Sequence, residues 1–141
     1  MIVKNINFTN YIAKRPIAIL ANSSFYLTHY RLLLLKKLKE SDNYIISIAP
    51  SDLSSSFLSN HSLYIPWRIK RKKEFNLITS TISFLRLFLI IRSVKPKLVH
   101  SHTLKANLMS SIICFLLRIP IILSFTGLGK LSNYNRFYKL L

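Results

Sequence analysis

Five short apolar runs alternate with longer stretches of helical periodicity along this chain of 141 residues, and this alternation restricts the fold more than any other feature. The runs lie near residues 17–22, 44–49, 62–66, 97–102 and 120–125. They are continuous rather than alternately apolar and polar, which is typical of strands buried on both faces. The sequence therefore predicts an α/β protein, with a parallel sheet covered by helices on both faces.

The segments between the apolar runs predict helices. "THYRLLLLKKLKES" has leucines at helical spacing, with Thr28 as its N-cap. A long helix is expected over about 74–94, and another over 104–118 with Thr103 as N-cap. Residues 1–15 show no clear period, so we expect an N-terminal arm followed by one domain at 16–141.

Charge and cysteine content restrict the partners and the compartment. The chain has 21 Lys and Arg against four Asp and Glu, a formal net charge of +17 that favours anionic partners. AT-rich coding sequence also enriches lysine, so this basic charge alone identifies no partner. Cys114 is the only cysteine, which excludes an intrachain disulfide and a cysteine-rich zinc site and fits a cytoplasmic setting.

Two apolar stretches bear on membrane association. Residues 75–94 and 106–125 are interrupted by arginines, so neither has about 18 uninterrupted apolar residues, and both are expected to form core. The basic "RIKRKK" at 68–73 is either a solvated loop or a contact with an anionic membrane surface. We expect a cytoplasmic protein, with peripheral attachment at the inner face of the plasma membrane left open.

Three polar segments follow predicted strands, namely "NSSFYLTH", "HSHTLK" and "TGLGK". The carboxyl ends of parallel strands share one edge of the sheet, where ligands bind in open α/β folds. We therefore expect these segments to form a ligand-binding rim. Its candidate residues are Asn22, Ser23, Ser24, His29, Arg31, His102, Thr103, Lys105, Thr126, Gly127 and Gly129.

The two histidines of "LVHSH" are two positions apart, so on a strand both point to the same face. His100 is expected to be a hydrogen-bonded core residue, whereas His102 lies at the strand exit and is expected to be functional. A metal site is not expected, because no third ligand is evident and acidic residues are scarce.

The other rim residues each have two interpretations. Lys105, in the first turn of its helix, either binds an anion together with backbone N–H groups or is a solvated lysine. Arg31 either contacts a carboxylate or phosphate or is an ordinary surface arginine. Gly127 and Gly129 permit close approach of the backbone to a ligand, but they form neither a G-x-G-x-x-G nor a Walker A motif.

Two long segments resemble the family 4 glycosyltransferases. "NSSFYLTHYRLLLLKKLKESDNYIISIAP" is similar to the family's first β-α-β unit, and "KPKLVHSHTLKANLMSSIICFLLRIPIILSFTGLGKL" to its fourth strand and helix and its fifth strand. The resemblance covers about residues 16–131 and is closest to members that extend polysaccharide or lipid-linked saccharide chains. It implies a GT-B fold of two Rossmann-like domains, of which this sequence is the N-terminal, acceptor-binding half.

The resemblance also implies residue roles and an activity. The family histidine at the fourth strand's exit falls on His102, as the catalytic candidate, and the anion-contacting first loop falls on 22–31. The implied activity is sugar transfer from a nucleotide-sugar to a saccharide or lipid-linked acceptor in cell-envelope polysaccharide synthesis, with no cofactor. Against the family pattern, we expect no C-terminal donor domain within these 141 residues. We therefore expect a truncated or split enzyme, inactive alone, with a donor-domain subunit as partner.

Two alternatives from other classes stay open. One is a non-catalytic, membrane-associated subunit that recruits a glycosyltransferase. The other is a basic nucleic-acid-binding module, using nine Phe and seven Tyr for stacking. No RNP-like or helix-turn-helix pattern supports the second alternative, so nucleic acid is not an expected partner.

Overall fold

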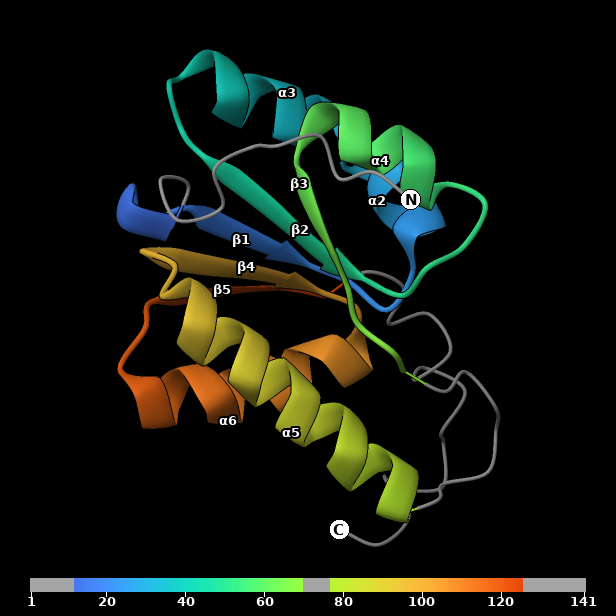
Figure 1. Cartoon of the computed structure of the whole chain (residues 1–141), viewed down its shortest axis with the longest axis vertical. Helices are drawn as coiled ribbons and strands as arrows, with labels where there is room; N and C mark the ends of the chain where they lie inside the picture. Colours follow the sequence, from blue (N-terminus) through green and yellow to red (C-terminus); the bar gives the residue numbers. More distant parts are fainter. Residues whose placement is uncertain (1–11, 70–76, 126–141) are drawn as a thin grey trace, which may run out of the picture.

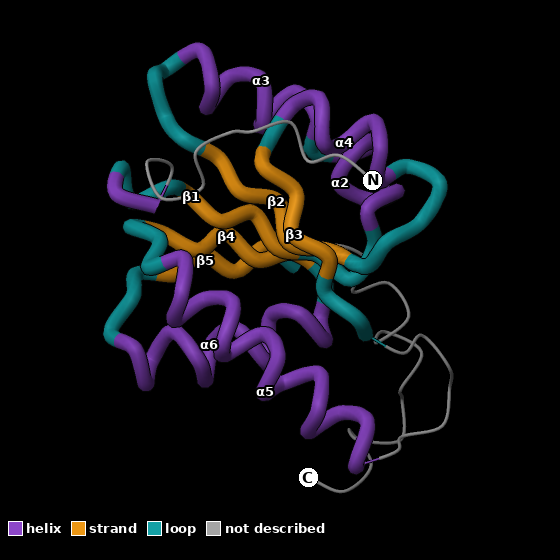
Figure 2. Tube along the Cα trace, viewed as in Figure 1, coloured by secondary structure: helices purple, strands orange, loops and turns teal. Residues whose placement is uncertain are grey.

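A computed structural model describes residues 12–69 and 77–125 and shows a parallel five-stranded sheet between two layers of helices (Figures 1 and 2). The α/β class and the five predicted strands are thereby confirmed. Each strand is slightly shorter than its apolar run. The strands are β1 (Ile17–Leu20), β2 (Ile45–Ala49), β3 (Leu63–Pro66), β4 (Leu98–His102) and β5 (Ile121–Ser124).

The strand order is β3-β2-β1-β4-β5, and every neighbouring pair is parallel. The first three strands are added in sequence from β1 at the centre to β3 at one edge of the sheet. The chain then returns to the centre, where β4 pairs with β1, and β5 forms the other edge (Figure 1). The order reverses between β1 and β4. In open α/β sheets this switch point is where the loops diverge and leave a crevice at the carboxyl ends of the strands.

One face of the sheet is covered by three short helices, α2 (Ser24–Tyr30), α3 (Leu32–Glu40) and α4 (Ser55–His61) (Figure 1). They bury the odd-numbered side chains of β1 and β2, because successive residues of a strand face opposite sides. This core contains Ile17, Ile19, Ala21, Leu27, Leu35, Ile45, Ala49 and Leu58.

The prediction that a helix begins after Thr28 was wrong. The first helix after β1 is α2, and its N-cap is Ser23. The extended backbone of Ser23 lets its Oγ accept a hydrogen bond from the N–H of Tyr26 at 3.4 Å. Thr28 lies inside α2, where its hydroxyl donates to the carbonyl oxygen of Phe25 at 2.9 Å. The leucine run forms α3, and Arg31 separates the two helices.

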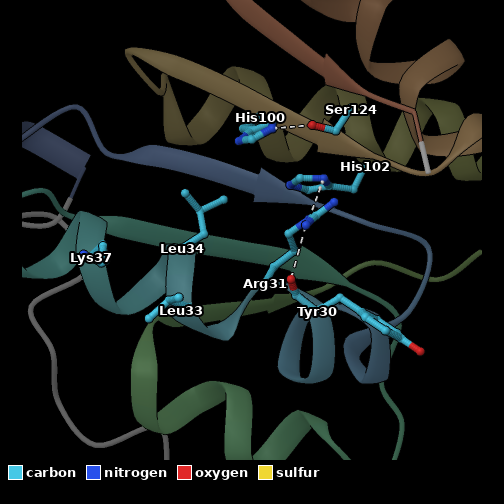
Figure 3. A pocket seen from close by; sticks show the side chains of 8 residues that line it. All are labelled: Tyr30, Arg31, Leu33, Leu34, Lys37, His100, His102 and Ser124. Atoms are coloured by element: carbon cyan, nitrogen blue, oxygen red, sulfur yellow. Dashed lines mark hydrogen bonds between the residues drawn. The ribbon is translucent and has the colours of Figure 1, made fainter.

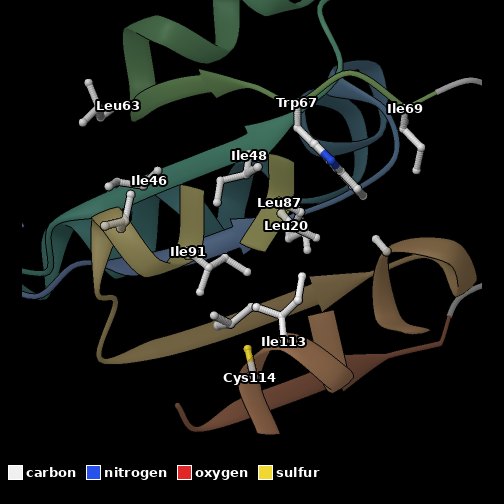
Figure 4. Close-up of a cluster of buried hydrophobic side chains, with 14 residues drawn as sticks. Leu20, Ile46, Ile48, Leu63, Trp67, Ile69, Leu87, Ile91, Ile113 and Cys114 are labelled. Atoms are coloured by element: carbon white, nitrogen blue, oxygen red, sulfur yellow. The ribbon is translucent and has the colours of Figure 1, made fainter. Parts of the chain in front are cut away.

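The opposite face is covered by α5 (Leu77–Val94) and α6 (Leu104–Leu117), which confirms two further predicted helices. Figure 4 shows their inward side chains with those of the sheet, from Leu20 and Ile48 to Ile113. Cys114 is buried in this core, and burial raises the pKa of its thiol to about 11, in keeping with its interpretation as a small core residue.

Within the described ranges, α5 is the one helix that is long and apolar enough to cross a membrane, with a mean hydropathy of 1.7. Arg86 and Arg92 are the two charged residues of this helix and do not remove it from this class, so the expectation that they exclude a span was wrong. The inner side of α5 nevertheless packs on the sheet through Leu87, Ile91 and Val94. The inner side of the helix therefore belongs to the core, as predicted, although only 22% of the helix is buried.

Candidate functional site

The site begins with a contact between two segments that are 71 residues apart. Nε of Arg31 donates a hydrogen bond of 3.2 Å to Nδ1 of His102. Arg31 follows α2, and His102 is the last residue of β4. The contact therefore joins the segment after β1 to the end of β4, at the switch point between these two strands (Figure 3). The structure thus brings together two of the residues that the sequence placed at the rim.

This contact determines where His102 carries its proton. A guanidinium N–H can only donate, so Nδ1 accepts and the neutral ring is protonated at Nε2. Burial, and then the neighbouring His100 and Arg31, lower the pKa of His102 to about 3. Nε2 is buried and has no hydrogen-bond partner among the described residues. At neutral pH His102 is therefore an uncharged donor that is not satisfied within this part of the chain.

His100 lies beside His102 on the same sheet face, with 4.2 Å between ring centroids, as predicted from their spacing. Its Nε2 is hydrogen-bonded to Oγ of Ser124 at 2.7 Å, which confirms the predicted hydrogen bond. The prediction that His100 is a core residue was wrong, because its side chain is only partly buried and lines the pocket described below. Burial, and then the charge of Arg31, lower its pKa. Asn107 also contacts Ser124, because its side-chain amide donates a hydrogen bond of 3.0 Å to the carbonyl oxygen of Ser124.

A pocket of about 440 Å³ opens where α2 and α3 meet β4 and β5. Its lining combines cationic or hydrogen-bonding groups with two leucines and lacks a carboxylate among the described residues. Figure 3 shows these side chains around the Arg31–His102 contact. The lining residues are Tyr30, Arg31, Leu33, Leu34, Lys37, His100, His102 and Ser124. Such a lining suits an anionic or hydroxyl-rich ligand better than a cation.

Thr103, the residue after His102, has a backbone φ of 77°, which is unfavourable for a β-branched side chain. It is the N-cap position of α6, as predicted, although its side chain makes no capping hydrogen bond. Backbone strain of this kind costs roughly 1–3 kcal/mol and concentrates at functional sites. Here the strained turn directs the chain from His102 into α6.

The serines of the predicted first loop make hydrogen bonds within the domain. Oγ of Ser24 donates to the carbonyl oxygen of Pro50 at 2.6 Å, while Ser23 caps α2. Oδ2 of Asp52 accepts from the backbone N–H of Phe25 at 3.1 Å. A carboxylate of the chain therefore already lies at the start of α2, and Asn22 belongs to the same loop.

Three other groups of predicted residues lie away from the pocket or outside the described ranges. His29 is exposed and stacks on Phe25, with ring centroids 3.8 Å apart. Lys105 lies in the first turn of α6 and is not among the described residues that line the pocket. Thr126, Gly127 and Gly129 lie outside the described residues, so their roles stay predictions.

Sequence reasoning missed Ser124, Lys37 and Tyr30 as pocket residues. The register offers a signal for Ser124, since it pairs with His102 at the end of neighbouring strands. Lys37 and Tyr30 reach the pocket only because α2 and α3 turn at Arg31. Within the described ranges, no group of three or more His, Cys, Asp or Glu residues could hold a metal ion.

The parallel sheet, its strand order and the rim at the switch point define the chain as a Rossmann-like domain of the GT-B type. A model of the glycosyl transferase 4-like family matches residues 16–140. The chain therefore belongs to the glycosyl transferase 4-like family, which confirms the resemblance seen in the sequence.

Solved structures with this fold include glycosyltransferases. MurG of Acinetobacter baumannii shares 13% identity at a TM-score of 0.61, over 84% of this chain and 39% of that one. The glycotransferase of kitacinnamycin shares 14% at a TM-score of 0.66, over 89% and 34%. A Rickettsia africae glycosyltransferase shares 18% at a TM-score of 0.59, over 78% and 29%.

These identities establish a shared fold and no more. The aligned part amounts to between 29% and 39% of the length of these three structures. A search of curated proteins found no match to the chain.

Proposed function

We propose that this chain is the acceptor-binding domain of a glycosyltransferase that moves a sugar from a nucleotide-sugar to a saccharide or lipid-linked acceptor. The family match and the GT-B neighbours support the transferase class. The observation that carries the rest is the pocket at the switch point, where Arg31, Lys37 and His102 face one space without a carboxylate among its described lining residues. Cell-envelope polysaccharide synthesis is the process that we propose for it.

In this proposal the chain works with a donor-binding domain, supplied by another subunit or by further sequence. Arg31 and Lys37 attract the phosphate of a lipid-linked acceptor, because cations bind phosphate oxygens through charge-assisted hydrogen bonds. His102 acts as a neutral donor rather than a general base, since its pKa is about 3 and Nδ1 is already engaged. A ligand oxygen can reach the buried Nε2 only if lining side chains move slightly.

The acceptor class suggests where the protein acts. Lipid-linked acceptors reside in a bilayer, and the net charge of +17 favours anionic surfaces. We therefore place the protein in the cytoplasm, peripherally at the inner face of the plasma membrane, as part of this proposal.

A titration tests the site without sugar transfer. The purified chain would be titrated with inorganic pyrophosphate and with geranyl diphosphate, following the ring ¹⁵N signals of His100 and His102. We expect saturable binding that weakens by about tenfold or more in Arg31→Gln, the loss expected for a charge-assisted hydrogen bond. Lys36→Gln removes the same charge from an exposed position on α3 outside the described pocket lining, and should bind as wild type does. Equal weakening in both variants, or no saturable binding, would contradict the proposed site.

A further inference from the structure

The outer side of α5 carries an apolar stripe. Its large exposed side chains have exposed fractions between 46% and 71%, and they are Leu77, Ile78, Ile82, Leu85 and Leu89. The last four follow one another at spacings of four, three and four residues, so they lie along one side of the helix. Only 22% of this helix is buried, which leaves an unusually apolar surface in contact with solvent.

The inner side of α5 fixes the helix on the domain. Ser83, Leu87 and Ile91 are buried, and the indole Nε1 of Trp67 donates to the carbonyl oxygen of Ser83 at 2.9 Å. The hydroxyl of Ser83 donates in turn to the carbonyl oxygen of Arg68 at 3.1 Å. Figure 4 shows Trp67, Leu87 and Ile91 in the same core. Spanning a bilayer would require α5 to leave this core, so the stripe can meet lipid only with the helix lying on a surface.

The charges around the stripe have one sign. Arg86 and Arg92 are exposed on α5, and Arg86 is four residues from Ile82 and three from Leu89. No Asp or Glu occurs anywhere in the sequence after Glu74. A second copy seated on this stripe would bring like charges together with no carboxylate on the helix to neutralise them. An anionic headgroup surface would neutralise them instead.

We propose, building on the function proposed above, that the outer face of α5 binds an anionic lipid bilayer. Leu85, Leu89 and their neighbours in the stripe enter the boundary between headgroups and acyl chains, and Arg86 and Arg92 contact lipid phosphates. This is how an interfacial helix with an apolar side and basic flanks associates with membranes. The surface lies on the opposite side of the sheet from the helices α2 and α3 that border the pocket (Figure 1).

Sedimentation with vesicles tests the apolar stripe. Vesicles of phosphatidylcholine alone are compared with vesicles that also contain phosphatidylglycerol. The wild type should bind the anionic vesicles, and Leu85→Glu/Leu89→Glu should bind them at least about tenfold more weakly. The matched control is Leu53→Glu/Phe57→Glu, which makes the same change at two exposed positions in and before α4, on the other side of the sheet. It should bind within about twofold of wild type.

A second variant tests the charges and keeps the test decisive if the first variant does not fold. Arg86→Gln/Arg92→Gln alters only exposed groups and should lose most of the preference for anionic over neutral vesicles. Wild type that does not bind anionic vesicles would overturn the proposal. So would two α5 variants that bind as wild type does, or a dimer that only Leu85→Glu/Leu89→Glu dissociates. Vesicle binding needs no sugar or donor domain, so the pyrophosphate titration separately tests the proposed function.

Discussion

The guanidinium of Arg31 holds the ring of His102 by a 3.2 Å hydrogen bond from Nε to Nδ1. Arg31 is itself held by a bond from Nη1 to the carbonyl oxygen of Tyr30 at 3.2 Å and by the ring of Tyr26, whose centroid is 5.5 Å from Cζ. Because three contacts position the arginine, the tautomer of His102 is imposed from α2 across the sheet. The site therefore depends on packing between the two halves of the sheet as much as on the histidine.

Arg31→Lys should release His102 while keeping the positive charge. An ammonium group does not reproduce the planar geometry of Nε, so Nδ1 loses its donor and the ring can exchange its proton between nitrogens. The ring ¹⁵N shifts of His102 should move from a pure Nε2–H form toward a mixture, and the free energy of unfolding should fall by about 1 kcal/mol. Arg92→Lys, at an exposed position on α5, is the control and should change neither. An unaltered tautomer in Arg31→Lys would refute this assignment.

Acid should destabilise the fold through His102. In the unfolded chain the ring protonates below about pH 6.5, whereas in the folded chain its pKa is about 3. Between these values the unfolded form binds more protons, so stability falls as the pH is lowered from 6.5 towards 3. His100, whose pKa is also lowered, acts in the same direction.

The measurement is urea unfolding of wild type and His102→Gln at a series of pH values. The variant should show a shallower loss of stability below pH 6.5, since only His102 differs and the carboxylates titrate in both proteins. Parallel curves for the two proteins would show that His102 titrates normally in the folded state.

Asp52 should contribute more to the free energy of unfolding than an ordinary surface carboxylate does. Its Oδ2 accepts from the N–H of Phe25 at 3.1 Å and its Oδ1 from the N–H of Ser54 at 2.9 Å, so it joins the starts of α2 and α4. Asp52→Ala should lower the free energy of unfolding by about 1–2 kcal/mol, as for other lost caps. Glu40→Ala, which removes an exposed carboxylate at the end of α3, should stay within about 0.5 kcal/mol of wild type. Equal effects in thermal unfolding would contradict the prediction.

Arg118→Gly should stabilise the domain. Arg118 ends α6 in the left-handed region, at φ 54° and ψ 43°, and the N–H of Ile119 bonds to the carbonyl oxygen of Cys114 at 2.9 Å. Glycine adopts this conformation without the penalty of a Cβ atom, so we expect a gain of about 0.5–1 kcal/mol by denaturant titration. Lys105→Gly loses the same charge inside the same helix and should instead cost about 1 kcal/mol. A loss of stability in Arg118→Gly would mean that its side chain contributes more than its backbone costs.

The strands and the longer helices could be predicted because their signals are local. A continuous apolar run such as "PIAILA" is stable only where both faces are covered, and that requirement is visible in the sequence. The start of α2 was predicted incorrectly because Ser23 and Thr28 are both acceptable caps. The choice between them depends on Asp52 and Pro50, which lie on a distant loop.

For the site, the sequence by itself determined that His100 and His102 share a face at the end of a strand, because side chains alternate along a strand whatever surrounds them. It left Arg31 open between a ligand contact and a surface residue. Only the tertiary structure decided that Arg31 pairs with His102, that His100 pairs with Ser124, and that His102 is neutral with its proton on Nε2. Partners and pKa values arise from groups that folding brings together from distant parts of the chain, and periodicity carries no information about that proximity.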